Sequence, residues 1–78
     1  MSAVHLELDC RGQRCPRPVI ELARHLGEVA VGEVVAVVTE DAAAATDVPA
    51  WCRLRSQEYV GQDVAEDGTP RQLVRRLS

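Results

Sequence analysis

The sequence contains no phenylalanine and no lysine, and its aromatic residues other than histidine are Trp51 and Tyr59. All nine basic residues are arginines, and twelve acidic residues leave a formal net charge of −3. Nucleic-acid binding draws much of its affinity from neutralised phosphates, and single strands also stack on aromatic rings. We therefore expect no direct nucleic-acid binding by this acidic chain.

Long apolar runs are also missing. No segment approaches the ~20 apolar residues of a membrane-spanning helix, and no signal-peptide pattern is present. We therefore expect no membrane contact and a cytoplasmic protein. With 78 residues and 46% apolar content, the chain has the size and composition of one ordinary globular domain over residues 1–78.

The sequence has three cysteines, Cys10, Cys15 and Cys52, and no pair of them has CxxC spacing. An odd number without a secretory signal indicates reduced thiols rather than a disulfide framework. A structural zinc site needs four ligands, usually in close pairs, and the sequence offers no such set. We therefore expect no metal site, and nothing in the sequence indicates a cofactor.

Hydrophobic periodicity predicts the first half of the chain. Residues 4–9 alternate apolar and polar, which is typical of a strand with one buried face. From Pro16 the period becomes helical and predicts a helix that ends near Gly27. The apolar face of this helix consists of Val19, Leu22, Ala23 and Leu26. The uninterrupted apolar run at residues 34–39 predicts a strand buried on both faces.

The second half begins with a helix-forming segment at residues 42–47. Pro49 predicts either a short helix followed by a new turn or a kink in one helix. We expect Trp51 and Leu54 to anchor this segment to the sheet. Two further strands are predicted at residues 58–65 and 71–77, joined by an Asp-Gly hairpin. The order β-α-β-α-β-β predicts a two-layer α/β sandwich of the α+β class.

The segment from residue 9 to residue 18 places Cys15 at the start of the first predicted helix. A helix start presents unpaired N–H groups and partial positive charge, which favour a thiolate. Prolines are tolerated in a first helical turn, and this turn would hold Pro16 and Pro18. Arg11, Arg14 and Arg17 add positive charge nearby. This pattern predicts a reactive Cys15, and the alternative is a small buried side chain.

The same segment resembles the signature of the TusA/SirA family of small sulfur carrier proteins. The matching positions are Asp9, Arg11, Gly12, Cys15, Pro16 and Pro18, and the resemblance extends over nearly the whole chain. It implies a mixed four-stranded sheet with both helices on one face. It also implies that Cys15 is the catalytic nucleophile, carrying a persulfide sulfur, with the other five matching residues supporting it.

The resulting hypothesis is a sulfur carrier of the sulfurtransferase type. Cys15 would accept sulfur from a cysteine desulfurase or a rhodanese-like donor protein and pass it to an acceptor protein. Family resemblance is compatible with tRNA thiolation, molybdenum-cofactor maturation or sulfur metabolism as the final pathway. A relay protein must expose its thiol to two partners in turn, so we expect a monomer.

Two other functions remain open at this stage. A non-catalytic RNA- or protein-binding module could use a basic stripe of Arg71, Arg75 and Arg76 on the last strand. A thiol redox regulator could pair Cys10 with Cys15, although burial is the more common state of a free cysteine.

Several polar residues can be interpreted as structural as well as functional. Asp9 and Arg11 fit loop orientation or donor contact and, equally well, a local salt bridge that shapes the turn at Gly12. Acidic residues around a helix are usually capping or solvated, and we interpret Glu40, Asp41 and Asp47 in this way. His5 and His25 are interpreted as surface residues, because neither is expected within hydrogen-bond reach of Cys15.

Overall fold

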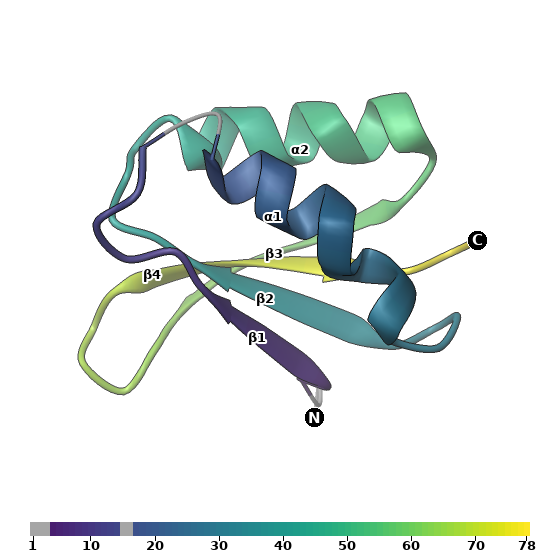
Figure 1. Ribbon diagram of the computed structural model, residues 1–78, viewed down its shortest axis with the longest axis horizontal. Coiled ribbons are helices and arrows are strands. Elements are labelled where there is room, and N and C mark those ends of the chain that lie inside the picture. The colour runs from purple at the N-terminus through teal and green to yellow at the C-terminus, as the bar shows by residue number, and fades with distance from the viewer. Residues whose placement is uncertain (1–3, 15–16) are drawn as a thin grey trace.

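Four strands form one mixed sheet, and two helices pack side by side on one of its faces (Figure 1). The computed structural model describes residues 4–14 and 17–78, so Cys15 and Pro16 lie outside the described residues, as do residues 1–3. The elements, in chain order, are β1 (Leu6–Asp9), α1 (Arg17–His25), the 3-10 turn η1 (Leu26–Glu28), β2 (Val34–Val38), α2 (Ala44–Arg55), β3 (Glu58–Val64) and β4 (Pro70–Arg75).

The strand order in the sheet is β1-β2-β4-β3. β1 pairs with β2 in parallel, whereas β4 pairs with β2 and with β3 in antiparallel directions. Two helices on one face of this mixed sheet make the two-layer α+β sandwich that the sequence and its family resemblance predicted. Because β1 and β2 run in parallel, their carboxyl ends lie at the same edge of the sheet.

β2 is the centre of the core, and all five of its residues are buried. Val35 and Val37 belong to the main cluster beneath the helices, together with Leu22 and Val48. The alternate residues of the strand point to the opposite face, where Val34 and Ala36 pack with Leu73. The prediction of a strand buried on both faces is therefore confirmed.

α1 buries a narrower stripe than its sequence predicted. Pro18 and Leu22 are buried, and Leu26 continues the stripe one turn later in η1. Their spacing of four places them above one another on the helix. Ala23 was predicted to lie on this face but is exposed, because the buried stripe follows Pro18, Leu22 and Leu26 and Ala23 lies to one side of it.

α2 is one continuous helix with Pro49 inside it, so the predicted short helix followed by a new turn is not found, and the alternative of a single helix holds. Pro49 is the sixth residue of α2, so the hydrogen-bond ladder loses one N–H there and the helix continues through it. Ala44, Val48 and Cys52, spaced four apart, bury the inner face. Leu54 is 79% exposed, so its predicted anchoring role is wrong.

Trp51 does pack, half-buried, against the main cluster, as predicted. The β3–β4 hairpin also follows the prediction. The Ala65 N–H donates to the Thr69 carbonyl at 2.8 Å, and Gly68 takes a φ of +87° within the turn. A left-handed φ of this kind favours glycine, which explains the Asp-Gly pair.

Candidate functional site

Residues 10–14 form the loop that leads from β1 toward Cys15, and we call it the thiol loop. It starts inside the sheet, where the Cys10 N–H donates to the Val38 carbonyl at 2.8 Å. The Gln13 N–H donates back to the Cys10 carbonyl at 3.1 Å and closes a turn. Gly12 has a φ of +78° in this turn, which confirms the turn predicted for it.

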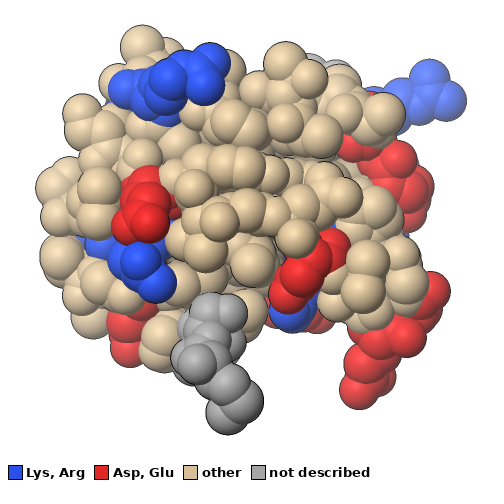
Figure 2. Space-filling view, turned by 180° about the vertical axis from the view of Figure 1, so that it is seen from behind, with Lys and Arg blue, Asp and Glu red and all other residues tan. Residues whose placement is uncertain are grey.

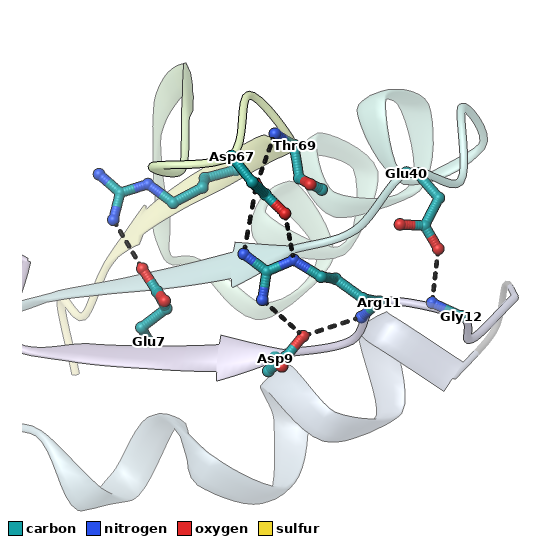
Figure 3. Close-up of polar contacts among 8 residues, drawn as sticks. Glu7, Asp9, Arg11, Gly12, Glu40, Asp67 and Thr69 are labelled. Carbon is teal, nitrogen blue, oxygen red and sulfur yellow. Dashed lines mark hydrogen bonds and ion pairs between the residues drawn. The ribbon is translucent and has the colours of Figure 1, made fainter.

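Arg11 joins the thiol loop to the β3–β4 hairpin (Figure 3). Its guanidinium lies 3.2 Å from an Asp9 carboxylate oxygen and 3.2 Å from an Asp67 carboxylate oxygen. The Arg11 N–H also donates to Asp9 Oδ1 at 3.1 Å. Asp9 and Arg11 therefore form the local salt bridge that was one of their two interpretations, and Asp67 extends it to a distant element.

The Asp67 carboxylate is held ionised by its surroundings. Hydrogen bonds from Thr69 and the nearby Arg11 guanidinium lower the pKa of Asp67 to about 2. In turn, hydrogen bonding to Asp67 raises the pKa of Arg11. The charge that Arg11 was expected to lend to Cys15 is thus shared with two carboxylates, whereas Arg14 and Arg17 are exposed and form no ion pair within residues 4–14 and 17–78.

Glu40 joins the thiol loop to the segment between β2 and α2. The Gly12 N–H donates to Glu40 Oε1 at 2.5 Å (Figure 3). Next to it, Asp41 Oδ1 accepts the Ala43 N–H at 3.0 Å at the start of α2. Asp41 therefore makes the local contact expected of it, Glu40 contacts the thiol loop rather than α2, and Asp47 is half-buried on α2.

Both helices begin at the end of the molecule where the thiol loop lies (Figure 1). Helix N-termini carry partial positive charge, so α1 and α2 both direct this charge to one edge of the sheet. A hollow of about 480 Å³ lies there, lined by Gly12, Gln13, Arg14, Glu40, Asp41 and Ala42. Acidic side chains gather at this end of the molecule, the right-hand edge of the view from behind (Figure 2).

The two described cysteines are in the core. Cys10 and Cys52 are each 1% exposed and are free thiols. Burial, with smaller effects of Glu21 and Asp9, raises the pKa of Cys10. Burial alone raises the pKa of Cys52 to about 11. Both thiols are therefore protonated at neutral pH, and the buried Cys10 offers no support for a redox pair with Cys15.

The two histidines make structural contacts. His5 Nδ1 accepts the Val34 N–H at 3.1 Å, beyond the end of β1 that lies opposite the thiol loop. His25 lies at the last turn of α1 and contacts Glu21 and Glu28. His5 is exposed, as predicted for a surface residue, and His25 is half-buried.

The arginines of β4 do not form the basic stripe that the sequence predicted. Arg71 pairs with Asp63 at 2.7 Å and with Glu7 at 2.8 Å, and these contacts raise its pKa. Arg75 pairs with Glu58 at 3.1 Å. Arg76 lies beyond the strand and donates to the Val29 carbonyl at 2.6 Å. Their charge is used within the fold, which weakens the RNA-binding alternative.

Residues 4–14 and 17–78 contain neither a membrane-spanning helix nor a cluster of metal ligands. No helix there is long and apolar enough to cross a bilayer. No group of three histidine, cysteine, aspartate or glutamate side chains within the described ranges is arranged to hold a metal ion.

The contacts of Glu40 and Asp67 with the thiol loop were not predicted. The sequence indicated capping or solvation for Glu40 and a hairpin turn for Asp67. The hairpin turn is present, whereas α2 has no side-chain cap and Glu40 contacts Gly12 instead. The contacts of Glu40 with Gly12 and of Asp67 with Arg11 depend on how the sheet brings separate loops together. The only sequence signal for it is that all three loops follow or precede strands at the same edge.

Comparison with known proteins shows what the chain resembles. The family model described as "Sulfurtransferase TusA" matches residues 6–76. A protein of Archaeoglobus fulgidus, provisionally named a sulfur carrier, is 40% identical over 60 residues, or 77% of this chain and 82% of its own length. Sulfur carrier protein TusA of Pseudomonas entomophila is 39% identical over 62 residues, which cover 80% of this chain and 76% of that protein.

A solved structure shares the architecture. The crystal structure of a SirA-like protein from Desulfitobacterium hafniense superimposes with a TM-score of 0.76. The match covers 94% of this chain and 99% of the other, at 20% sequence identity. At this identity the likeness supports the fold, and it agrees with the two-layer arrangement described above.

Proposed function

Because the chain belongs to the TusA/SirA family of sulfur carrier proteins, we propose that it accepts a persulfide sulfur on Cys15 and relays it to an acceptor protein. Its donor in this proposal is a cysteine desulfurase or a rhodanese-like protein. The acceptor serves tRNA thiolation, molybdenum-cofactor maturation or sulfur metabolism.

The observation that carries this proposal is the contrast among the three cysteines. Cys10 and Cys52 are buried and have raised pKa values, so they are poor nucleophiles at neutral pH. Cys15 follows the polar thiol loop, two residues before the first residue of α1 in the chain. The starts of α1 and α2 give that end of the molecule the partial positive charge that favours a thiolate.

The proposed reaction is a thiol–persulfide exchange. The Cys15 thiolate attacks the terminal sulfur of the donor's persulfide and forms a new S–S bond. The donor's own S–S bond breaks at the same time, and the electron pair leaves with the donor cysteine as a thiolate. The acceptor thiolate then repeats the exchange on the Cys15 persulfide. Sulfur moves without net oxidation, so no cofactor, metal or external oxidant takes part.

The supporting residues hold the backbone around Cys15. Asp9 and Arg11 fix the first part of the thiol loop, and Gly12 supplies the left-handed turn. Pro18 is buried in the first turn of α1 and anchors the start of that helix to the core. Pro16 is assigned to the same stiffened turn on the basis of the family signature.

Other parts of the proposal concern the molecule as a whole. A single domain over residues 1–78 acts as a cytoplasmic monomer, so that one face can meet the donor and then the acceptor. It contacts proteins rather than nucleic acid or membrane. Support comes from the paired β4 arginines, which leave little free positive charge on that strand.

Intact-mass spectrometry tests this function. The protein is incubated with a cysteine desulfurase and cysteine, beside the Cys15→Ser and Cys10→Ser variants. We expect the wild type and Cys10→Ser to gain one sulfur atom that a reductant removes, and Cys15→Ser to gain none. Loading that survives in Cys15→Ser would overturn the assignment, and loading that stops in Cys10→Ser would favour a two-cysteine redox cycle.

A further inference from the structure

Carboxylates from two segments distant in sequence hold the thiol loop at neighbouring residues. Glu40, between β2 and α2, accepts the Gly12 N–H, and Asp67, on the β3–β4 hairpin, binds Arg11 (Figure 3). We propose that Glu40 and Asp67 are positioning residues for sulfur transfer, because they fix the loop from which Cys15 follows. This inference rests on the function proposed above and adds two residues to its site.

The hydrogen bond to Glu40 favours one backbone conformation at Gly12, a residue that can adopt many. Gly12 populates a φ of +78°, a region that glycine enters at little cost but shares with many alternatives. The 2.5 Å bond to Glu40 Oε1 is charge-assisted and therefore among the stronger hydrogen bonds in proteins. Without this bond, Gly12 can adopt more backbone conformations. The position of Cys15, three residues later in the chain, is then expected to vary with them.

The orientation of the Asp67 carboxylate is fixed within its own turn as well as by Arg11. Its Oδ1 accepts the Thr69 N–H at 3.0 Å, which fixes the carboxylate within its own turn. Both carboxylate oxygens then face the guanidinium, with Nε to Oδ2 at 3.2 Å and Nη2 to Oδ1 at 3.4 Å. Exposed pairs of this kind add little to stability, so their effect is expected in the position of the loop.

Two readouts test Glu40: the rate of Cys15 alkylation as a function of pH, and the KM and kcat of loading by a desulfurase. Alkylation is mapped to the Cys15 peptide, so the buried thiols do not contribute. In Glu40→Ala we expect about tenfold slower alkylation at pH 7, a lower kcat, and a pH profile moved to higher pH, because a loop that is no longer fixed would hold Cys15 less well at the helix starts that favour a thiolate. Removal of the carboxylate charge alone would move the profile to lower pH. Glu40→Gln retains an acceptor for Gly12 and should recover most of the loss.

The matched control is Glu66→Ala, which removes the same charge from the β3–β4 hairpin. Glu66 forms no hydrogen bond or ion pair with any described residue. Wild-type alkylation in Glu40→Ala would overturn the role of Glu40. So would a higher KM with an unchanged pH profile, because that result identifies a contact with the donor protein. Circular dichroism and the Tm show whether each variant is folded.

A double-mutant cycle tests Asp67. Asp67→Ala should slow Cys15 alkylation about threefold in the wild-type background and have no further effect on Arg11→Ala. Equal effects in both backgrounds would show that Asp67 does not act through Arg11, and no effect in either would remove it from the site.

Alkylation needs no sulfur donor, so the two proposals fail separately. A wild type that never gains sulfur, combined with a shifted profile in Glu40→Ala, would reject the sulfur-carrier function and retain the positioning role. Normal loading of the wild type, with no effect of Glu40→Ala on either readout, would retain the sulfur-carrier function and reject the positioning role of Glu40.

Discussion

The core beneath the helices and the thiol loop are held together by different forces. In the core, Leu22, Val35 and Val48 are completely buried and stabilise the fold by removing apolar surface from water. In the thiol loop, Arg11 and Gly12 are exposed and are fixed by hydrogen bonds and ion pairs with distant carboxylates. The core therefore dominates the free energy of unfolding, and the proposed role of the loop contacts is to position Cys15.

Cysteine chemistry follows the same division. Cys10 and Cys52 belong to the core cluster, where burial makes the charged thiolate unfavourable and raises their pKa values. Cys15 follows Cys10 by five residues in the chain, and we propose it as the reactive thiol. The fold thus keeps Cys10 and Cys52 protonated, and the proposal assigns the chemistry to the third cysteine.

Among the variants that test this comparison, Leu22→Ala is expected to have the largest effect on the free energy of unfolding. Truncating a fully buried leucine leaves a cavity and should lower the free energy of unfolding by about 2–5 kcal/mol. Leu54→Ala is the matched control, because Leu54 is 79% exposed and its truncation should cost less than about 0.5 kcal/mol. Urea denaturation measures both changes.

The Leu22→Ala variant also tests whether the two regions are separate. Once corrected for the folded fraction, its rate of sulfur loading should stay within about twofold of wild type, because the loop contacts are unchanged. A tenfold loss of loading in the folded protein would show that core packing and thiol position are coupled, contrary to the comparison.

A smaller effect is expected from the Cys52 thiol at alkaline pH. The pKa of Cys52 is about 11 in the folded state and near 9 when unfolded, so the folded state binds the proton more tightly between these values. Its contribution to stability is present below pH 9 and disappears as the pH rises toward 11. Between pH 8 and pH 10 the protein should lose about 1 kcal/mol of stability through this group.

Cys52→Ala isolates that contribution. Its free energy of unfolding should fall less steeply between pH 8 and pH 10 than that of the wild type, whatever the cost of the substitution at neutral pH. Parallel pH dependences in the two proteins would mean that Cys52 ionises as readily in the core as in the unfolded chain.

Sequence reasoning succeeded where local pattern decides the structure. The apolar run of β2 and the Asp-Gly hairpin each carry their signal within a few residues, and both predictions are confirmed. Leu54 shows the limit of that reasoning, because Cys52 rather than Leu54 fills the inner position of the last turns of α2.

The site was only partly predictable for the same reason. The left-handed turn at Gly12 and the Asp9–Arg11 contact are local, and the sequence indicated them. Glu40 and Asp67 reach the loop because parallel β1 and β2 bring their following loops to one edge, and because the β3–β4 hairpin turns back to it. Such contacts depend on sheet order, which periodicity does not specify.

The most direct test of this account is the rate at which each cysteine of the folded protein reacts with iodoacetamide at pH 7, read by peptide mass spectrometry. We expect Cys15 to be alkylated at least about a hundredfold faster than Cys10 and Cys52, because those two thiols are buried with raised pKa values, whereas Cys15 is proposed to be accessible and ionised. Comparable rates for Cys15 and either buried cysteine would contradict the division between an inert core and a reactive loop.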